Sequence, residues 1–396
     1  MFRRLVRQLN PVAYSSIPMT QPCVSIVIPT YNHDRFVCDA IDSALAQTYP
    51  EVEVVVVDDG STDHTRDRVT QYAGRIIYIY QENKGLSEAR NAGVRAAHGE
   101  LFLFLDADDR IPASKLALQV PLFENRPELG LVYSGFQYVD ESGIQVLGVV
   151  RPNKQGQVLR DLLRRTFFFP PGAAVVRREC LNQVGLFDPV CSSAADTDLW
   201  IRIARAGYAF GYVDEPLFQY RVVKDSMSRD HRKQARHELI RLEKFFSDTE
   251  LPDDIKKLQP EAYSVLHYEF AAKHFSAGQI ELAQGHLQQA IALCPALASD
   301  KEWLLEWIAG FALERYPDTA HQIIDSIFDN LPPEANTLRT LRRRAFGRYH
   351  VAAAFSEHQN RHLKNVRRHI LPALLGDPGI IQNRGFISIA IKSLLA

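Results

Sequence analysis

The sequence has 396 residues, of which 46% are hydrophobic and 23% charged, and its formal net charge is −1. This length suggests roughly two to three domains with ample core, and the near-neutral charge argues against a broad nucleic-acid-binding surface. No stretch reaches the ~18 consecutive apolar residues of a membrane-spanning helix. Five cysteines without a C-x-x-C pair indicate a reducing, cytoplasmic compartment rather than a disulfide framework.

The first predicted element is a buried strand at residues 24–28, a continuous apolar run that leads into Pro29. The proline is expected to stop the ladder and to fix the backbone where the chain leaves the strand. No G-x-G-x-x-G sequence follows, which disfavours a dinucleotide-binding domain.

A second buried strand is predicted at 52–57, and Asp58, Asp59 and Gly60 follow it. These residues could simply form an Asp-Gly turn. One carboxylate could instead accept a hydrogen bond from a bound base or sugar, because ligands bind beyond the carboxyl ends of strands in open α/β sheets. The residues alone leave both alternatives open.

A third strand is predicted at 76–80, followed by a helix with Ser87 as its cap and a face of small residues for close packing on the sheet. Lys84 and Arg90 belong to this segment. Their charges could balance a diphosphate, or either could be a surface charge, which is the simpler interpretation of Lys84.

The most informative stretch is 101–109, where an apolar run that reads as a buried strand ends in Asp106, Asp108 and Asp109. Burying a bare carboxylate is costly, so these acids should meet water, a cation or a ligand. Oxygen ligands at a strand end suit a hard divalent ion such as Mg²⁺ or Mn²⁺, which keeps waters and takes phosphate oxygens from a substrate. A solvated loop with Asp109 as a helix cap is the alternative.

The second half of the sheet is expected to be partly antiparallel, because 130–139 and 144–150 flank a turn and indicate a hairpin. Three phenylalanines at 167–169 could line an acceptor pocket, although core packing accounts for at least two of them. An amphipathic helix is predicted from Asp196 to Gly207. Asp196 could serve as its N-cap, and a carboxylate held there could also act as a general base toward an acceptor hydroxyl.

These segments, in this order, resemble the family-2 glycosyltransferases of the GT-A fold over about residues 22–228. The matching segments are VSIVIPTYN (24–32), VVVVDDGSTD (54–63), NKGLSEARNAG (83–93), GELFLFLDADD (99–109), VGLFDP (184–189) and DTDLWIRIARAGY (196–208). The resemblance implies an α/β fold, a Rossmann-like mixed sheet flanked by helices. It also divides the chain into an N-terminal extension (1–21), a catalytic domain (22–228) and an all-α C-terminal domain (229–396).

The resemblance also implies a donor site, a metal site and a catalytic base. Asp196 matches the family's base, and Asp108 would coordinate Mn²⁺ or Mg²⁺ on the diphosphate, with Asp106 beside the ribose and at the metal. The implied donor-binding residues are Pro29, Thr30 and Tyr31 around the base, Asp58 and Asp59, Lys84 and Arg90 near the phosphates, and Asp106, Ala107 and Asp108.

Two departures from the family pattern concern this site. Many relatives have Glu-Asp where this chain has Ala195 and Asp196, so a supporting carboxylate is missing. Many relatives also carry a His shortly after a Tyr-Arg pair, whereas Val222 and Val223 follow Arg221 here. The Ser-Met-Ser sequence at 226–228 still matches the family's closing loop.

From residue 229 onward the sequence predicts helices. Residues 263–275 and 280–293 resemble one tetratricopeptide-like hairpin, too few for a solenoid, so an all-helical appendage packed on the catalytic domain is expected. The basic segments 339–348 and 361–368 could present a basic face, and the amphipathic segments 1–10 and 386–396 could lie on an anionic membrane. Solvated faces are the alternative.

The sequence therefore predicts an inverting, metal-dependent transferase with Asp196 as general base. It would move a sugar from a nucleotide-sugar, with a UDP-sugar favoured, to a hydroxyl of a glycan or lipid-linked glycan, as in polysaccharide biosynthesis. The expected location is cytoplasmic, with peripheral contact at the inner face of the membrane left open. The alternative is a non-catalytic sugar-nucleotide or carbohydrate-binding module whose helical tail recruits a partner. A nucleotidyltransferase is disfavoured, because no Gly-rich phosphate loop precedes the acids.

Overall fold

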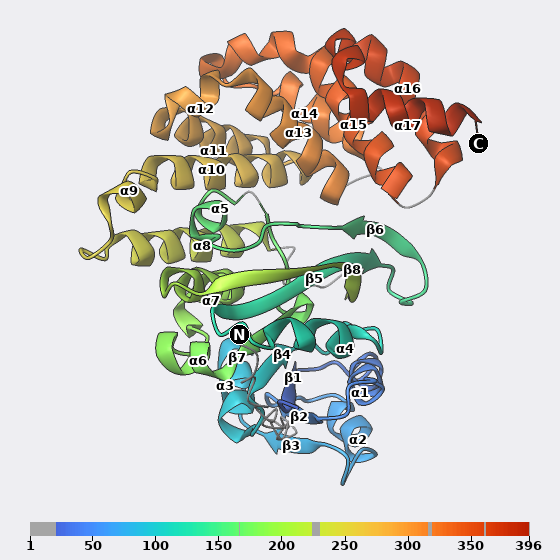
Figure 1. The fold of residues 1–396 in the computed structure, drawn as a ribbon. Coiled ribbons are helices and arrows are strands. Elements are labelled where there is room, and N and C mark those ends of the chain that lie inside the picture. The colour runs from blue at the N-terminus through green and yellow to red at the C-terminus, as the bar shows by residue number, and fades with distance from the viewer. Residues whose placement is uncertain (1–20, 166, 224–229, 316–318, 360–361, 396) are drawn as a thin grey trace, which may run out of the picture.

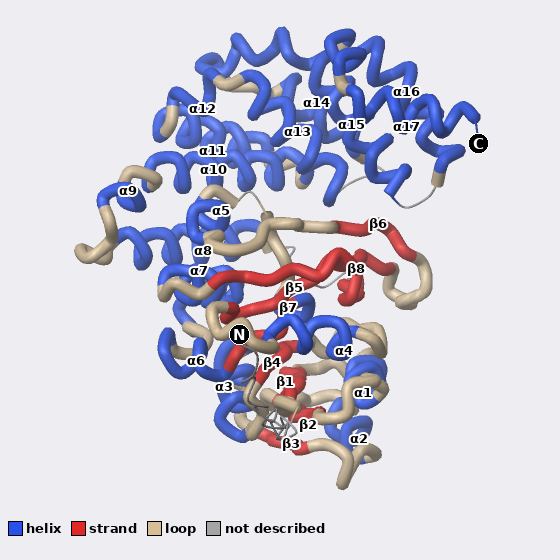
Figure 2. Tube along the Cα trace, in the orientation of Figure 1, coloured by secondary structure: helices blue, strands red, loops and turns tan. Residues whose placement is uncertain are grey.

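The computed structural model describes residues 21–165, 167–223, 230–315, 319–359 and 362–395. The predicted amphipathic segment 1–10 and the closing-loop motif at 226–228 lie outside the described residues. The described strands and their flanking helices form one part of the molecule, and the helices from His231 onward stack on one side of it (Figures 1 and 2).

The sheet has eight strands in the order β3-β2-β1-β4-β7-β5-β6, and β8 pairs with β5. The pairs among β1 to β4 are parallel, β7 is antiparallel to both β4 and β5, β6 is antiparallel to β5, and β8 is parallel to β5. The predicted mixed sheet is confirmed. The strands are β1 Val24–Thr30, β2 Val52–Asp58, β3 Ile77–Tyr80, β4 Leu101–Phe104, β5 Leu129–Val139, β6 Val146–Val150, β7 Ala174–Arg177 and β8 Ala209–Arg221.

Strand β1 runs past Pro29 to Thr30, so the expectation that the proline stops the ladder was wrong. Alternate backbone nitrogens of β1 face β2 on one side, as Val24 N does toward Glu51 O, and β4 on the other. The nitrogen of Pro29 therefore faces β4. Because β4 pairs with β1 only as far as Phe104 opposite Val27, no ladder bond is lost at the proline.

Helices cover the sheet, so strands β1 and β4 are buried along their whole length and read as continuous apolar runs. The helices of this part are α1 Val37–Leu45, α2 Thr65–Thr70, α3 Leu86–Ala96, α4 Lys115–Gln119, α5 Leu159–Leu163, α6 Arg178–Val184 and α7 Ala195–Arg205. Three short 3₁₀ segments accompany them: η1 Val120–Phe123, η2 Pro171–Ala173 and η3 Pro189–Ala194.

The remainder of the described chain is helical, as predicted. Its helices are α8 His231–Phe246, α9 Asp253–Lys256, α10 Gln259–Ser276, α11 Ile280–Leu293, α12 Pro295–Ser299, α13 Lys301–Arg315, α14 Ala320–Asp329, α15 Arg342–Gln359, α16 Leu363–Gly376 and α17 Arg384–Leu395, with 3₁₀ segments η5 Pro333–Leu341 and η6 Pro378–Gln382. No helix in the described part of the chain has the length and apolar character needed to cross a membrane.

Two helical hairpins of this region repeat one contact. The Nδ1 atoms of His267 on α10 and His286 on α11 lie 2.9 Å apart. The Nδ1 atoms of His350 on α15 and His369 on α16 also lie 2.9 Å apart, at the same spacing of 19 residues. The described chain therefore has two such hairpins, where the sequence predicted one. The second hairpin has a proline, Pro372, inside its second helix, which obscured its helical pattern.

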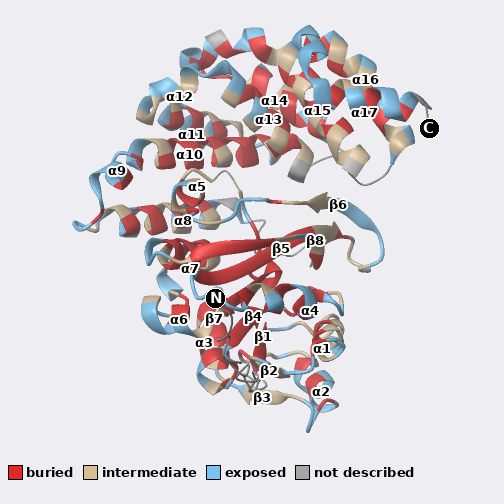
Figure 3. Cartoon of the chain, viewed as in Figure 1, coloured by how far each residue is buried: buried red, intermediate tan, exposed pale blue. Residues whose placement is uncertain are grey.

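The hydrophobic core does not divide at the start of the helical region. One continuous buried cluster runs from Val24 on β1 to Phe270 on α10 and includes Leu242 and Phe245 of α8. Two further clusters lie within the remaining helices. Figure 3 shows the buried residues running from the sheet into α8 and α10. Helix α8 therefore shares the core of the sheet and its flanking helices, while the domain boundary at 228 stays a prediction.

Candidate active site

The exits of β1 and β2 are tied to each other at the carboxyl edge of the sheet. The backbone N–H of Asp59 donates to Thr30 O at 2.9 Å. Asn32, which has a positive φ of 55°, donates its N–H to Ser61 Oγ at 3.0 Å and accepts from the N–H of Thr62 at 2.8 Å. Tyr31 stands between these bonds and is 45% exposed, so its ring is open to a ligand.

Both carboxylates after β2 are buried and engaged within the protein. Asp58 accepts from the N–H of Ser61 at 2.8 Å and from the hydroxyl of Tyr78 at 2.9 Å. Asp59 accepts from the Gln81 side chain and from the backbone N–H groups of Lys84 and Gly85, at 2.6, 2.9 and 2.8 Å. Asp58 therefore makes the expected turn contact with Ser61, whereas Asp59 binds the segment before α3. The contact of either carboxylate with a donor base stays a prediction.

Helix α3 begins at Leu86 with Gly85 as its N-cap, so the expectation that Ser87 caps it was wrong. Gly85 has φ of 86°, a conformation that favours glycine. The hydroxyls of Ser87 and Thr30 are buried and have no hydrogen-bond partner among the described residues. Lys84, just before α3, is exposed.

Arg90 extends from α3 to the acid that follows β4. Its Nη2 donates to Asp106 Oδ1 at 2.6 Å, and its guanidinium lies 5.2 Å from the centroid of the Phe187 ring. The Arg90 side chain is 4% exposed, whereas that of Asp106 is 31% exposed. A buried cation therefore holds one face of Asp106 and leaves another face open.

Asp106, Asp108 and Asp109 lie close enough to repel one another. Burial raises the pKa of Asp109 well above its ordinary value, and Asp108 and Asp106 add to the rise. Burial likewise raises the pKa of Asp108, and Asp106 adds to it, while His33 lowers it in part. Ala107, between Asp106 and Asp108, is 1% exposed and packs in the core. We call residues 106–109 the acidic loop.

Arg221, at the end of β8, holds the acidic loop, and the sequence did not assign it this role. Its backbone N–H donates to Asp109 Oδ1 at 2.8 Å, and its Nε donates to Asp108 O at 2.7 Å. Its Nη2 donates to Asp39 Oδ2 at 2.7 Å and its Nη1 to Glu141 O at 2.8 Å. The sequence signal for this role is the Tyr-Arg pair at 220–221.

The acidic loop fits a divalent ion that is completed by a substrate. No group of three or more His, Cys, Asp and Glu side chains in the described ranges is arranged to hold a metal alone. Among the same residues, no side chain donates a hydrogen bond to the Asp108 carboxylate. Burial and the charge of Asp106 raise its pKa more than His33 and Arg221 lower it, so the protein compensates its charge only in part. Two carboxylates that leave positions for water and phosphate oxygens are the donor set that Mg²⁺ and similar ions use with phosphate substrates.

Asp196 lies in the first turn of α7, and Ala194 is the N-cap, so the expectation that Asp196 caps the helix was wrong. Its Oδ1 accepts from the N–H of Thr197 at 2.8 Å. Burial raises the pKa of Asp196, Arg90 lowers it in part, and Glu238 and Asp106 add to the rise. The predicted base and the acidic loop thus act on each other through Arg90.

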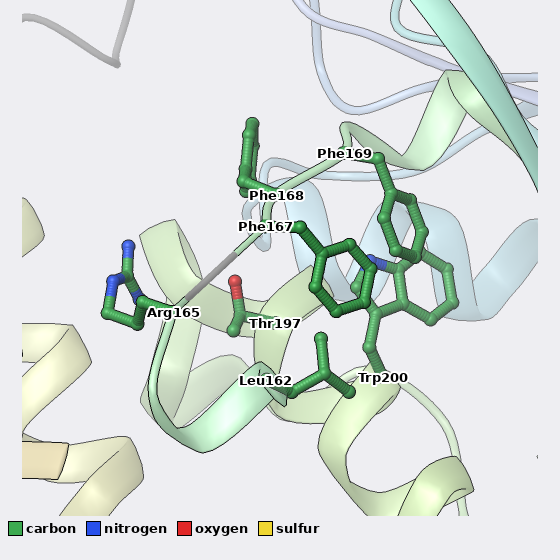
Figure 4. A pocket seen from close by; sticks show the side chains of 7 residues that line it. All are labelled: Leu162, Arg165, Phe167, Phe168, Phe169, Thr197 and Trp200. Atoms are coloured by element: carbon green, nitrogen blue, oxygen red, sulfur yellow. The ribbon is translucent and has the colours of Figure 1, made fainter. Parts of the chain in front are cut away.

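Residues 167–169, which we call the phenylalanine loop, lie beside Thr197 and Trp200 of α7, as Figure 4 shows. Phe167 and Phe169 point toward Trp200, and the Phe169 ring stacks on the Trp200 ring with centroids 5.5 Å apart. Phe168 points away from them and is 40% exposed. The cavity that they line with Arg165 and Thr197 has about 10 Å³ for a water-sized sphere, which is room for about one water rather than a sugar. Core packing thus explains two of the three rings.

Known proteins resemble both the sequence and the fold. The family model described as glycosyl transferase family 2 matches residues 25–185. The putative teichuronic acid biosynthesis glycosyltransferase TuaG of Bacillus subtilis is 30% identical over 222 residues, which are 54% of this chain and 85% of that protein. An uncharacterized glycosyltransferase of Rickettsia typhi is 32% identical over 212 residues, 51% of this chain and 64% of that protein.

Other relatives are matched over less of their length. A Rickettsia felis glycosyltransferase is 34% identical over 192 residues, 46% of this chain and 32% of that protein. The matches cover 28% to 64% of the length of these Rickettsia relatives. Among solved structures, the mannosyltransferase PcManGT from Pyrobaculum calidifontis, in complex with GDP-Man and Mn²⁺, is 23% identical with a TM-score of 0.51, covering 82% of this chain and 88% of that one.

The likeness to PcManGT confirms the predicted GT-A fold. The match to TuaG extends over 85% of that protein. The resemblance inferred from the motifs is thereby confirmed, and this chain belongs to glycosyl transferase family 2.

Proposed function

We propose that the protein is an inverting glycosyltransferase that moves a sugar from a nucleotide-sugar to a hydroxyl acceptor. The observation that carries the proposal is the arrangement around Arg90. This buried cation pairs with Asp106 at 2.6 Å, and its charge also lowers the pKa of Asp196. The acid assigned to the donor side and the acid assigned to the acceptor side therefore share one cation, as neighbouring groups of one reaction centre would.

Asp196 is the proposed general base. One of its oxygens accepts from the backbone N–H of Thr197, which leaves the other to accept the proton of an acceptor hydroxyl. As the acceptor oxygen loses that proton, it forms a bond to the anomeric carbon. The bond from that carbon to the diphosphate oxygen breaks, and the nucleoside diphosphate leaves with the bonding electrons. Attack opposite the leaving group inverts the configuration.

The acidic loop is the proposed metal site, held by Asp108 and Asp106. When bound there, Mn²⁺ or Mg²⁺ would neutralise the negative charge that develops on the departing diphosphate. The structure of PcManGT contains Mn²⁺ and GDP-Man, which supports this assignment. Arg221 keeps the loop in place, and Arg90 orients Asp106. Lys84 is exposed at the same edge and is proposed to approach the phosphates.

The donor is proposed to be a nucleotide-sugar, with its base against the exposed ring of Tyr31 and beside Pro29, Thr30, Asp58 and Asp59. A UDP-sugar stays the favoured donor, although PcManGT holds GDP-Man, so a test must include both bases. The name of TuaG, which refers to teichuronic acid biosynthesis, supports a glycan or lipid-linked glycan as acceptor.

The test is nucleotide release across a panel of UDP-, GDP- and dTDP-sugars with Mn²⁺ or Mg²⁺, comparing the wild type with Asp108→Ala and Glu100→Ala. Glu100 is an exposed acid at the opposite end of β4 and serves as the matched control. We expect metal-dependent release from one donor, lost in Asp108→Ala and kept in Glu100→Ala. Donor binding without release, in the presence of candidate acceptors, would favour the non-catalytic binding module instead.

A further inference from the structure

Helix α8 is held against the segment that leads into Asp196, although the two lie far apart in the sequence. The Nδ1 atom of His237 accepts from the backbone N–H of Ser193 at 3.1 Å and lies 2.8 Å from Ser193 Oγ. A nitrogen that accepts from a backbone N–H carries no proton, so this contact requires neutral His237. Burial lowers the pKa of His237, and Lys233 and Arg236 lower it further, which favours that form.

The other end of α8 holds both flanks of the same segment. Lys244 Nζ donates to Asp188 Oδ2 at 2.6 Å, just before η3, and lies 3.4 Å from Asp198 Oδ1 in the first turn of α7. Between these flanks the backbone leaves helical geometry at Ser192, with φ of 10° and ψ of −80°. Contacts from α8 therefore hold the bend at Ser192, which sets the direction in which α7 begins.

Glu238, one residue after His237, reaches the loop on the other side of Asp196. Its carboxylate lies 3.0 Å from Arg165 Nη1 and accepts from Arg241 Nε at 2.7 Å. Arg165 also pairs with Glu269 of α10, and its own φ is +51°. A non-glycine residue with positive φ is strained, and it keeps that conformation only where several surrounding contacts hold it. Arg165 stands just before the phenylalanine loop and lines the cavity with Thr197.

Glu238 is also a charge that acts on Asp196. Burial alone would raise the pKa of Glu238, but Arg165 and Arg241 lower it overall, so the carboxylate stays ionised. The charged groups that act on Asp196 are Arg90 from α3, Asp106 from the acidic loop and Glu238 from α8. A carboxylate that acts on Asp196 is therefore supplied from the helical region.

We propose that α8 forms part of the acceptor side of the site, with His237 and Glu238 as positioning residues for the segment that carries Asp196 and for the phenylalanine loop. The inference rests on the proposed function, because it assigns these residues to acceptor use. It gives the helical region a direct part in the reaction beyond covering the sheet.

The test compares Glu238→Gln with Glu261→Gln. Glu261 on α10 pairs with Arg164 at 2.9 Å, so it joins the same two parts of the chain one residue away from Arg165. We expect Glu238→Gln to lower kcat/KM for the acceptor roughly 10- to 100-fold through misplacement of the base, with an unchanged donor KM. Removing a negative charge near Asp196 also stabilises its ionised form, so the acid limb of the pH–rate profile moves to lower pH. Glu261→Gln should match the wild type in all three.

Equal effects of the two variants, or a wild-type acceptor kcat/KM and acid limb in Glu238→Gln, would overturn the proposal. A readout without turnover separates it from the proposed function. In His237→Leu we expect faster amide hydrogen exchange over 189–197, with unchanged exchange over strand β1. Unchanged exchange over 189–197 would refute the positioning role, whereas absence of sugar transfer in the wild type would refute only the proposed function.

Discussion

At the scale of single residues, Arg221 decides whether the acidic loop keeps its shape. The guanidinium donates to two backbone carbonyls and to Asp39, and it is 3% exposed. Lysine keeps the charge but has no planar fork, so Arg221→Lys should leave one or more of these acceptors unpaired. We expect the free energy of unfolding to fall by about 1–3 kcal/mol in urea denaturation, together with weaker metal-dependent nucleotide release.

The matched control for this change is Arg35→Lys. Arg35 pairs with Glu141 at 2.7 Å beside the same loop, but its side chain is 67% exposed. Exposed ion pairs contribute little to stability, so this variant should unfold like the wild type. A similar loss of stability in both variants would show that Arg221 has no special role.

Asp196 should set the acid limb of the reaction. A general base acts in its ionised form, and burial raises the pKa of this carboxyl above its ordinary value of 3.8. The rate of transfer should therefore be maximal above this raised pKa and should fall as the pH drops through it. Asp196→Asn should lower kcat by roughly 10²- to 10⁴-fold while donor binding persists. An acid limb at the ordinary aspartate value, or unchanged turnover in the variant, would contradict the assignment.

The sequence could predict those site residues whose role depends on their sequence neighbours, but not those whose partners are distant in the sequence. Asp106 and Asp108 follow an apolar run directly, so their place at a strand end could be predicted from the pattern alone. Arg221 could not be found in this way, because its partners Asp109 and Asp39 lie 112 and 182 residues away. His237 and Glu238 look like ordinary polar residues on an amphipathic helix, and only packing shows what they face.

At the scale of elements, α3 depends on a close approach to β1. The predicted small-residue face is confirmed, because a Cβ added at Gly93 would lie 2.3 Å from Val27 Cγ1. Gly93→Ala should therefore push the helix away from the strand and cost about 1–3 kcal/mol of unfolding free energy. A urea midpoint at or above that of the wild type would show that the helix can shift without cost.

Gly285→Ala on α11 is the matched control for Gly93→Ala. Gly285 also lies inside a helix, but a Cβ there would meet nothing within 4 Å. Alanine restricts the unfolded chain and suits a helix, so this variant should be more stable than the wild type by about 0.5–1 kcal/mol. If the free energy of unfolding falls in Gly93→Ala and rises in Gly285→Ala, the loss at Gly93 is due to packing and not to helix propensity.

Element ends were harder to predict than elements. The cap of α3 is Gly85 rather than Ser87, and the cap of α7 is Ala194 rather than Asp196. In both cases a side chain with good capping chemistry stands within the first turn instead. Tertiary contacts decide these boundaries: Asp59 binds the N–H of Gly85, and His237 binds that of Ser193. The sequence pattern holds no information on either contact.

At the scale of the whole molecule, the C-terminal helices leave an apolar and cationic surface. Five large apolar side chains of α16, η6 and α17 are more than half exposed: Leu371 63%, Leu375 56%, Ile381 65%, Ile391 53% and Leu394 64%. Within 362–395 the described exposed charges are Lys364, Arg367, Arg368, Arg384 and Lys392, since the acid Asp377 is buried and paired with Arg348. By contrast, the predicted basic segment 339–348 is largely neutralised, as Arg342, Arg344 and Arg348 pair with acids.

We expect this surface to bind anionic lipid. In vesicle flotation, the full chain should float with vesicles that contain phosphatidylglycerol and much less with neutral vesicles. The double change Leu371→Ser and Leu375→Ser should reduce flotation, whereas Leu118→Ser, at a 41% exposed leucine on α4, should not. Absence of flotation with either kind of vesicle would remove the membrane contact.

The repeated histidine pairs make the helical region sensitive to acid. Burial lowers the pKa of His286 and of His350 to about 4 from the ordinary 6.5, and the neighbouring histidines contribute. The unfolded chain therefore takes up these protons first, so stability that is present above pH 6.5 should be lost as the pH falls toward 4. The urea midpoint, followed by tryptophan fluorescence, should decline over this range.

Replacing both histidines, as His286→Gln with His350→Gln, should flatten that decline, whereas His64→Gln, at a side chain 79% exposed, should not. A decline that persists in the double variant would assign the acid sensitivity to other groups. Two imidazoles whose nitrogens lie 2.9 Å apart can share one proton but cannot both be charged without repulsion. The acid tolerance of the protein should therefore depend on its helical hairpins, far along the chain from the carboxylates proposed to carry the chemistry.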